Sequence, residues 1–118
     1  MKVVSTVLAG ALTAEFLAFG AAKLFAIAPM RERAEHLDYT TTAYRGIGAV
    51  EIVAAGGVLA GLAFPSIGMA AGTGLTLLMG GAVASHVRNG DGVQLFAPAV
   101  GSGLASLAYT LVLAGVSR

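Results

Sequence analysis

Among the ionisable side chains that interrupt the apolar stretches of this sequence are Lys23, Glu51 and His86. Buried groups of opposite type are typical of acid–base sites. Such a set could serve the isomerisation, cyclisation or epoxide opening of a lipophilic substrate. In that catalytic role Glu51 would be the acid or base, Lys23 its electrostatic partner and His86 a proton shuttle. No nucleophile motif is visible, so covalent catalysis is not expected.

The surroundings of these residues predict a membrane protein. Mean hydropathy is +0.84 and only 11% of residues are charged, against roughly a quarter in a typical soluble domain. Four apolar runs fill most of the 118 residues, and each reaches the ~20 residues that cross a ~30 Å hydrocarbon core as a helix. The strands of a membrane barrel would alternate polar and apolar residues, and these runs do not. We therefore predict an all-α bundle of four transmembrane helices.

The predicted helices form one membrane-embedded domain, 1–118, and cover about residues 3–28, 43–64, 66–88 and 96–117. Residues 31–38 are the only dense charge cluster, which we interpret as a short interfacial helix or capped loop, most simply a solvated connector. Tyr39 and Tyr44 beside it are interpreted as membrane-interface anchors. Residues 88–92 have strong turn chemistry, and Pro98 falls in the first turn of the last predicted helix.

Successive helices alternate in direction, so one half of the bundle collects nearly all of the charge. The opposite half carries Lys2 and Arg118 at its ends. We expect a shared, lipid-shielded cavity in the charged half, and the ligand-binding candidates are Glu15, Lys23, Arg45, Glu51, His86 and Arg88. Counts of Lys and Arg favour a cytoplasmic position for the charged face, four against two.

Glu15 differs from the other candidates because it falls near the bilayer centre. It lies eight residues before Lys23, an offset of about 80° around a helix, so both side chains can face one interior. A carboxylate at this depth costs on the order of 2.5–3.5 kcal/mol, and we expect it to face inward as a protonated or hydrogen-bonded group. The hydroxyl partners that we consider are Thr73, Ser102, Ser106 and Tyr109.

Each candidate also has a simpler interpretation. Lys23 and Glu51 could form a structural ion pair that locks the bundle. His86 could be an interfacial histidine with no task, and Arg88 and Asp91 could serve only the turn in which they lie.

Composition excludes several classes of function. The chain has no cysteine, so disulfides, thiolate redox chemistry and cysteine-based metal sites are excluded. A net charge of +1 without a basic stripe argues against nucleic acid. The two histidines, His36 and His86, lack the spacing of a zinc motif. We predict no metal and no cofactor.

Small residues recur at helical spacing. Residues 57–61 and 68–72 both match GxxxG, and Gly101 with Ala105 forms a related pair. Such residues let helix backbones approach closely, since lipid supplies no hydrophobic drive for helix association. They predict tight packing, either within the bundle or between the subunits of a homo-oligomer.

The sequence around the candidate site residues resembles the DoxX-like family of small four-helix membrane proteins. The segments that carry the resemblance are residues 20–24, 48–51, 59–62 and 81–91. The resemblance implies a four-helix bundle with a polar site formed by Lys23, Glu51 and His86. It implies little about activity, because members are diverse and some are associated with sulfur oxidation or oxidative-stress systems. We expect an integral protein of the bacterial cytoplasmic membrane.

A second resemblance is to the small multidrug resistance transporters, which exchange protons for cationic drugs through a carboxylate in their first helix. Glu15 matches that position, and Lys23 follows it. The chain departs from that pattern because it has no tryptophan, few aromatic residues in the middle helices and a charged connector after the first helix.

Three hypotheses of function follow. The leading one is a polar pocket in the membrane that binds a quinone- or isoprenoid-like molecule, or a bundle that supports a partner membrane protein. The second is the acid–base enzyme described above. The third is a proton-coupled exporter that uses Glu15.

Overall fold

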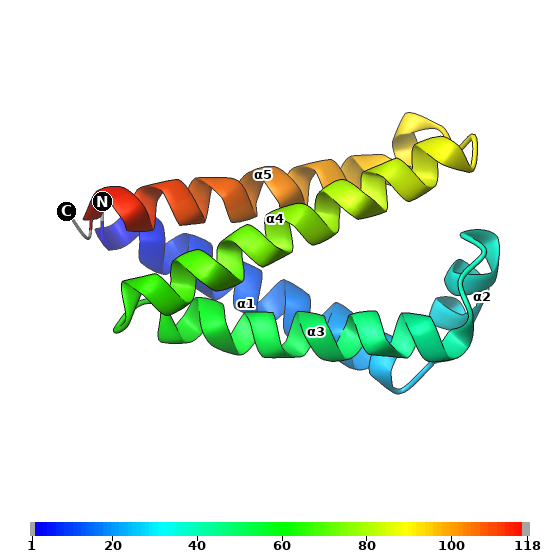
Figure 1. Ribbon diagram of the computed structural model, residues 1–118, viewed down its shortest axis with the longest axis horizontal. Coiled ribbons are helices and arrows are strands. Elements are labelled where there is room, and N and C mark those ends of the chain that lie inside the picture. Colours follow the sequence, from blue (N-terminus) through cyan, green and yellow to red (C-terminus); the bar gives the residue numbers. More distant parts are fainter. Residues whose placement is uncertain (1, 117–118) are drawn as a thin grey trace.

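The computed structural model describes residues 2–116, and every regular element in this part of the chain is an α-helix. The helices are α1 (Lys2–Leu24), α2 (Ala28–His36), α3 (Thr41–Ala60), α4 (Pro65–Arg88) and α5 (Val93–Val116) (Figure 1). Of these, α1, α3, α4 and α5 are long and apolar enough to cross a membrane, so the predicted all-α, four-span fold is confirmed. The predicted helix end at residue 117 and the charge of Arg118 lie outside the described residues.

The long helices form two close pairs. α1 packs along α3 and α4 packs along α5, while α3 touches α4, and α1 touches α5, over shorter stretches. Figure 1 shows the pairs close together at the end that holds the termini and spread apart toward α2. The largest core cluster lies in the terminal half, where Leu12, Val58, Leu75 and Tyr109 are fully covered. The spread half is left with room for a cavity.

Glycines set the closest helix contacts. A Cβ on Gly48 of α3 would lie 2.6 Å from the carbonyl oxygen of Gly20 in α1, so the backbones meet without room for a side chain. Gly61 and Gly68 meet where α3 ends and α4 begins, and a Cβ on either would strike the hydroxyl of Tyr109. The predicted GxxxG motifs therefore pack helices within this chain.

The charged segment after α1 is more than a solvated connector. It forms α2, whose Met30 and Ala34 are buried and pack with Tyr44 of α3. Pro29 lies in the first turn of α2, where helical N–H groups have no intrahelical partner and the missing one costs little. Two apolar side chains four residues apart thus hold one face of a mostly charged helix against α3. The charge content of the segment gave no sign of this buried face.

α5 begins at Val93, three residues before the predicted start at 96. Gly90 completes the preceding turn with a φ of +78°, a conformation that glycine adopts without strain. Pro98 consequently lies inside α5 and not in its first turn. Its ring removes the hydrogen bond that an N–H would donate to the Gln94 carbonyl oxygen, which loosens α5 beside the spread half of the bundle.

The glycine contact between α1 and α3 yields a matched test. Gly48→Ala should separate the helices and lower the free energy of unfolding by about 1–3 kcal/mol, because the new Cβ meets backbone atoms of α1. Gly46→Ala, two residues away, meets nothing within 4 Å and should be neutral or slightly stabilising. Reversible unfolding in mixed detergent micelles measures both. Equal effects of the two substitutions would show that α1 and α3 do not meet at Gly48.

Candidate functional site

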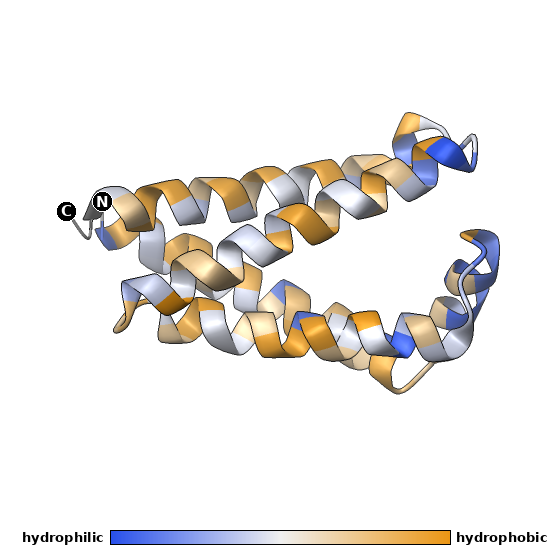
Figure 2. Cartoon of the chain, in the orientation of Figure 1, coloured by the Kyte–Doolittle hydropathy of each residue, from blue (hydrophilic) through white to orange (hydrophobic). Residues whose placement is uncertain are grey.

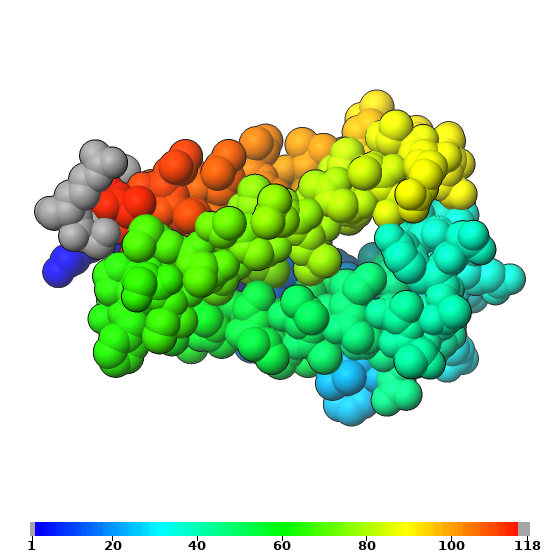
Figure 3. Space-filling model, in the orientation of Figure 1, coloured from blue at the N-terminus to red at the C-terminus, as the bar shows by residue number. Residues whose placement is uncertain are grey.

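A cavity of about 810 Å³ lies between the two helix pairs where they spread apart. Its walls come from α1 and α3 on one side and from α4 and α5 on the other, with α2 at the outer end. Figure 3 shows the hollow between α4 and the α2–α3 side of the molecule. Apolar side chains such as Phe16, Ile47 and Leu95 make up most of the wall. Polar groups gather at two places within it.

The first place, which we call the carboxyl site, is formed by Lys23 of α1 and Glu51 of α3. Because Gly20 and Gly48 let these helices approach, Lys23 Nζ reaches Glu51 Oε1 and donates a hydrogen bond to it. The side chains are 11% and 1% exposed, respectively. The amine also lies 5.3 Å from the centre of the Tyr44 ring, an arrangement that stabilises a cation.

The second oxygen of Glu51 lacks a partner. Of the buried side-chain nitrogen and oxygen atoms in residues 2–116, only Glu51 Oε2 has no hydrogen-bond partner. Buried polar groups are nearly always bonded, and one left unbonded costs about 1–3 kcal/mol. The folded chain therefore leaves a buried acceptor without a donor, on a side chain that lines the cavity.

The second polar place, which we call the mouth cluster, consists of His36, His86, Asn89 and Asp91. The carboxylate of Asp91 accepts hydrogen bonds from His36 Nε2 at 2.8 Å and from His86 Nδ1 at 2.6 Å. Asn89 Nδ2 donates to the same carboxylate at 3.2 Å. The cluster joins the end of α2 to the end of α4 and to the turn before α5.

A second link crosses the same gap. The hydroxyl groups of Tyr39, just before α3, and Ser85, in the last turn of α4, lie 2.7 Å apart. Figure 2 shows the hydrophilic residues of α2 and of the end of α4 at this one end of the molecule. Polar side chains from segments far apart in the sequence therefore bridge the outer end of the cavity.

Hydrogen bonding sets the protonation of Asp91. The bond from His86 holds the pKa of Asp91 below its ordinary value, partial desolvation opposes this, and bonds from His36 and Asn89 add to the lowering. A carboxyl group whose pKa falls on folding stabilises the fold above its ordinary pKa of about 3.9. This stabilisation is lost as the pH falls through the lower folded-state value. The mouth cluster should thus hold at neutral and mildly acidic pH.

The predicted site residues are only partly brought together. Lys23 and Glu51 are in contact, whereas His86 lines the same cavity but has Asp91 as its partner. Glu15 accepts a hydrogen bond from Ser102 of α5, one of the four hydroxyl groups considered for it. Ser102 lines the cavity, whereas Glu15, a predicted ligand-binding residue, is not among the lining residues.

Arg45 and Arg88 lie outside the cavity wall. Both are exposed, and Arg45 Nε donates a 2.9 Å hydrogen bond to the Leu24 carbonyl oxygen, which fastens the start of α3 to the end of α1. Sequence reasoning missed His36 and Asp91 as a pair, because they are 55 residues apart and no motif joins them. In the described part of the chain, no group of three or more His, Asp or Glu side chains could hold a metal ion.

The carboxyl site predicts that a double variant is more stable than one of its single variants. Lys23→Met should lower the free energy of unfolding by about 2 kcal/mol, because it leaves both oxygens of a buried carboxyl group without a donor. Adding Glu51→Gln removes the orphaned acid and should recover at least half of the loss. Unfolding of the single and double variants in mixed micelles measures this. A double variant less stable than Lys23→Met would contradict the described contact.

The mouth cluster predicts a pH-dependent effect. Asp91→Asn should be less stable than the native chain at pH 7. The difference should shrink as the pH falls below about 4, and it should vanish only at the lower pH at which Asp91 of the folded native chain is itself protonated. Asp38→Asn, at an acid in the same polar face, serves as the control and should change little. The measurement is thermal unfolding between pH 3 and 7. A difference that persists undiminished at pH 3 would mean that the carboxylate of Asp91 does not hold the mouth closed.

Comparison with known proteins agrees with this architecture. Residues 7–113 match the DoxX-like family, so the match reaches all four of the membrane helices. No curated protein and no solved structure matches the chain. The resemblance inferred from the segments around Lys23, Glu51 and His86 is thereby confirmed. This membrane protein belongs to the DoxX-like family.

Proposed function

We propose that this protein binds a lipophilic small molecule with a polar, hydrogen-donating head, and that the cavity between the helix pairs is its binding site. The observation that carries the proposal is Glu51 Oε2, a buried oxygen without a donor in a side chain that lines a cavity of about 810 Å³. A hydroxyl or amine group on a ligand would supply the missing hydrogen bond.

The size and lining of the cavity support this proposal. Small-molecule pockets occupy about 300–1,000 Å³ and combine apolar walls with a few converging polar groups. Here the polar groups nearest the membrane interior are Lys23, Glu51 and Ser102, and aromatic side chains such as Phe16 and Phe19 form the wall beside them. A head group would be oriented at the carboxyl site, and a tail would lie against the apolar wall.

The position of the cavity limits the chemistry of the ligand. Its walls belong mostly to helices that are able to span a membrane, so the ligand has to dissolve in hydrocarbon. Isoprenoid alcohols and hydroquinones meet both requirements, since each joins a hydroxyl donor to an apolar body. Both classes of ligand expected from the sequence therefore stay within the proposal, in their hydroxyl-bearing forms.

The other hypotheses receive less support from the geometry. An acid–base enzyme would use Lys23 and Glu51, which are in contact, but its proposed proton shuttle His86 is engaged by Asp91. An exporter would need Glu15 to face the transported molecule, and Glu15, which is bonded to Ser102, is not among the residues that line the cavity. These roles, like the support of a partner membrane protein, stay predictions.

The two carboxyl groups within the membrane offer a matched test of ligand binding. Farnesol should bind the native chain in lipid nanodiscs, and Glu51→Gln should weaken its affinity about tenfold, because hydrogen bonds to charged groups contribute about 1.5–3 kcal/mol. Glu15→Gln, which alters a carboxyl group outside the cavity lining, should change the affinity less than twofold. Ligand retention measured by native mass spectrometry gives the affinities.

Two outcomes would contradict the proposal. One is that neither farnesol nor a ubiquinol with a single isoprene unit binds the native chain in a saturable manner. The other is that Glu15→Gln weakens binding as much as Glu51→Gln does, which would move the polar contact away from the carboxyl site.

A further inference from the structure

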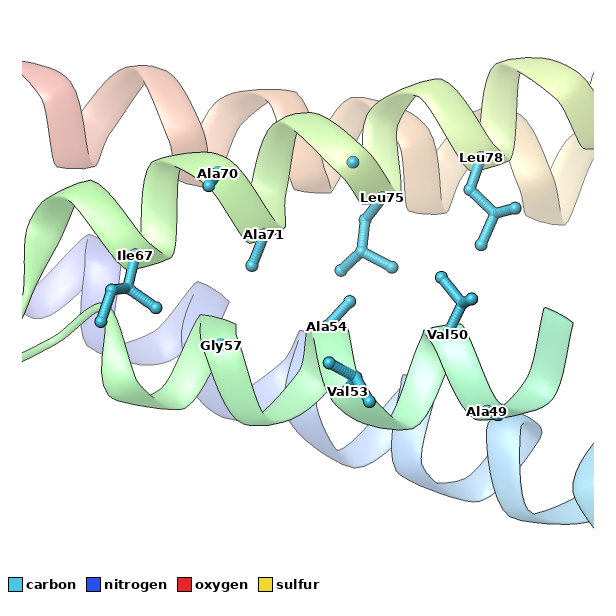
Figure 4. A pocket seen from close by; sticks show the side chains of 11 residues that line it. Ala49, Val50, Val53, Ala54, Gly57, Ile67, Ala70, Ala71, Leu75 and Leu78 are labelled. Atoms are coloured by element: carbon cyan, nitrogen blue, oxygen red, sulfur yellow. The ribbon is translucent and has the colours of Figure 1, made fainter. Parts of the chain in front are cut away.

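A second hollow lies on the outside of the bundle, between α3 and α4. This groove, which we call the seam groove, has a volume of about 510 Å³ and an entirely apolar set of lining side chains. Figure 4 shows Val50 and Ala54 of α3 facing Leu75 and Leu78 of α4 across it. Val53, at its rim, is 76% exposed, so the groove opens toward the surface that meets lipid.

The seam groove continues the cavity. Leu78 of α4 lines both hollows. On α3, Ile47 and Glu51 belong to the cavity, and Val50, between them in sequence, belongs to the groove. Leu78 therefore lies where a cavity lined by a carboxyl group adjoins a groove lined by none.

The packing of α3 and α4 explains why this seam is open. The two helices are drawn together where they are joined, at Gly61 and Gly68, and they diverge from there toward the charged face. Lipid supplies no hydrophobic drive to close the remaining gap, and close helix contact in a membrane depends on small residues. Only an apolar chain can fill such a gap in hydrocarbon without leaving polar groups unbonded.

The aqueous end of the cavity has the opposite character. There the hydrogen bonds from His36 and His86 to Asp91, together with the contact between Tyr39 and Ser85, join α2 to α4. A lipophilic molecule that entered from water would have to pass these polar groups. Entry along the seam would meet apolar side chains, among them Leu78.

We infer that the ligand enters the cavity sideways from the bilayer, past Leu78, and that its tail stays in the seam groove while its head occupies the carboxyl site. This inference rests on the proposed function and narrows its ligand class to long-chain amphiphiles. From Leu78 to Ile67 the groove follows α4 for roughly 17 Å at 1.5 Å per residue. The two hollows together therefore suit a chain of several isoprene units better than a compact molecule.

Two photoreactive probes test the head and the tail separately. Both are geranylgeraniol, with a diazirine either beside the hydroxyl group or in the last isoprene unit. In proteoliposomes the head probe should label residues of the cavity and the tail probe residues of the seam groove, and unlabelled geranylgeraniol should displace both. Peptide mapping by mass spectrometry locates the labels.

A covalent block at position 78 tests the entry route. The block is added to the folded protein, so a failure to fold does not account for its effect on labelling. The native chain has no cysteine, so the thiol of Leu78→Cys can be modified alone, in the assembled protein, with a benzyl methanethiosulfonate. This block should reduce labelling by both probes about tenfold, and a reductant should restore it. Leu104→Cys on α5 is the matched control, because Leu104 is 63% exposed and lines neither hollow. Its modification should leave labelling unchanged.

The outcomes separate this inference from the proposed function. Saturable labelling of the cavity by the head probe, unaffected by the block in Leu78→Cys, would overturn sideways entry and leave the binding function standing. Tail labelling of the groove that a photoreactive phospholipid matches and geranylgeraniol does not displace would assign the groove to bulk lipid and also overturn the inference. Absence of saturable head labelling in the native chain would overturn both.

Discussion

The contact of α1 with α3 at Gly20 and Gly48 determines the rest of the site. With no side chain at either position, the two backbones meet, and a lysine one turn further along α1 reaches a glutamate on α3. One carboxylate oxygen is satisfied by this contact and the other is not. A bulkier residue at Gly48 would separate the amine from the acid, so the chemistry of the site depends on a packing detail of the backbone.

The two halves of the bundle are packed differently. In the half that holds the termini, the helix pairs meet through a common core that includes Leu12, Val58, Leu75 and Tyr109. In the other half the pairs spread, and the cavity replaces the core. The spread ends at the mouth cluster on the charged face, and Leu78 lines it where the seam groove adjoins. These two places differ in kind, since hydrogen bonds hold the first and apolar side chains line the second.

Much of this architecture could be predicted from the sequence, because hydrocarbon imposes long apolar helices and alternating directions gather the charges at one face. The hydroxyl partner of Glu15 could be narrowed to four candidates by depth alone, and Ser102 is among them. The partner of His86 could not be predicted, since its contact with Asp91 depends on how the turn after α4 folds back. A short helix was one of the two forms expected for the charged segment, but the buried face of α2 could not be predicted, because it becomes evident only beside Tyr44.

The central claim is that the unpartnered oxygen of Glu51 takes a hydrogen bond from the head of a membrane-dissolved ligand. Infrared difference spectroscopy of the protein in lipid, with and without farnesol, tests it most directly, with Glu51→Gln used to assign the carboxyl band. Farnesol should shift a carboxyl or carboxylate band that is absent from Glu51→Gln and present in Glu15→Gln. A Glu51 band that stays unchanged at saturating farnesol would contradict the claim.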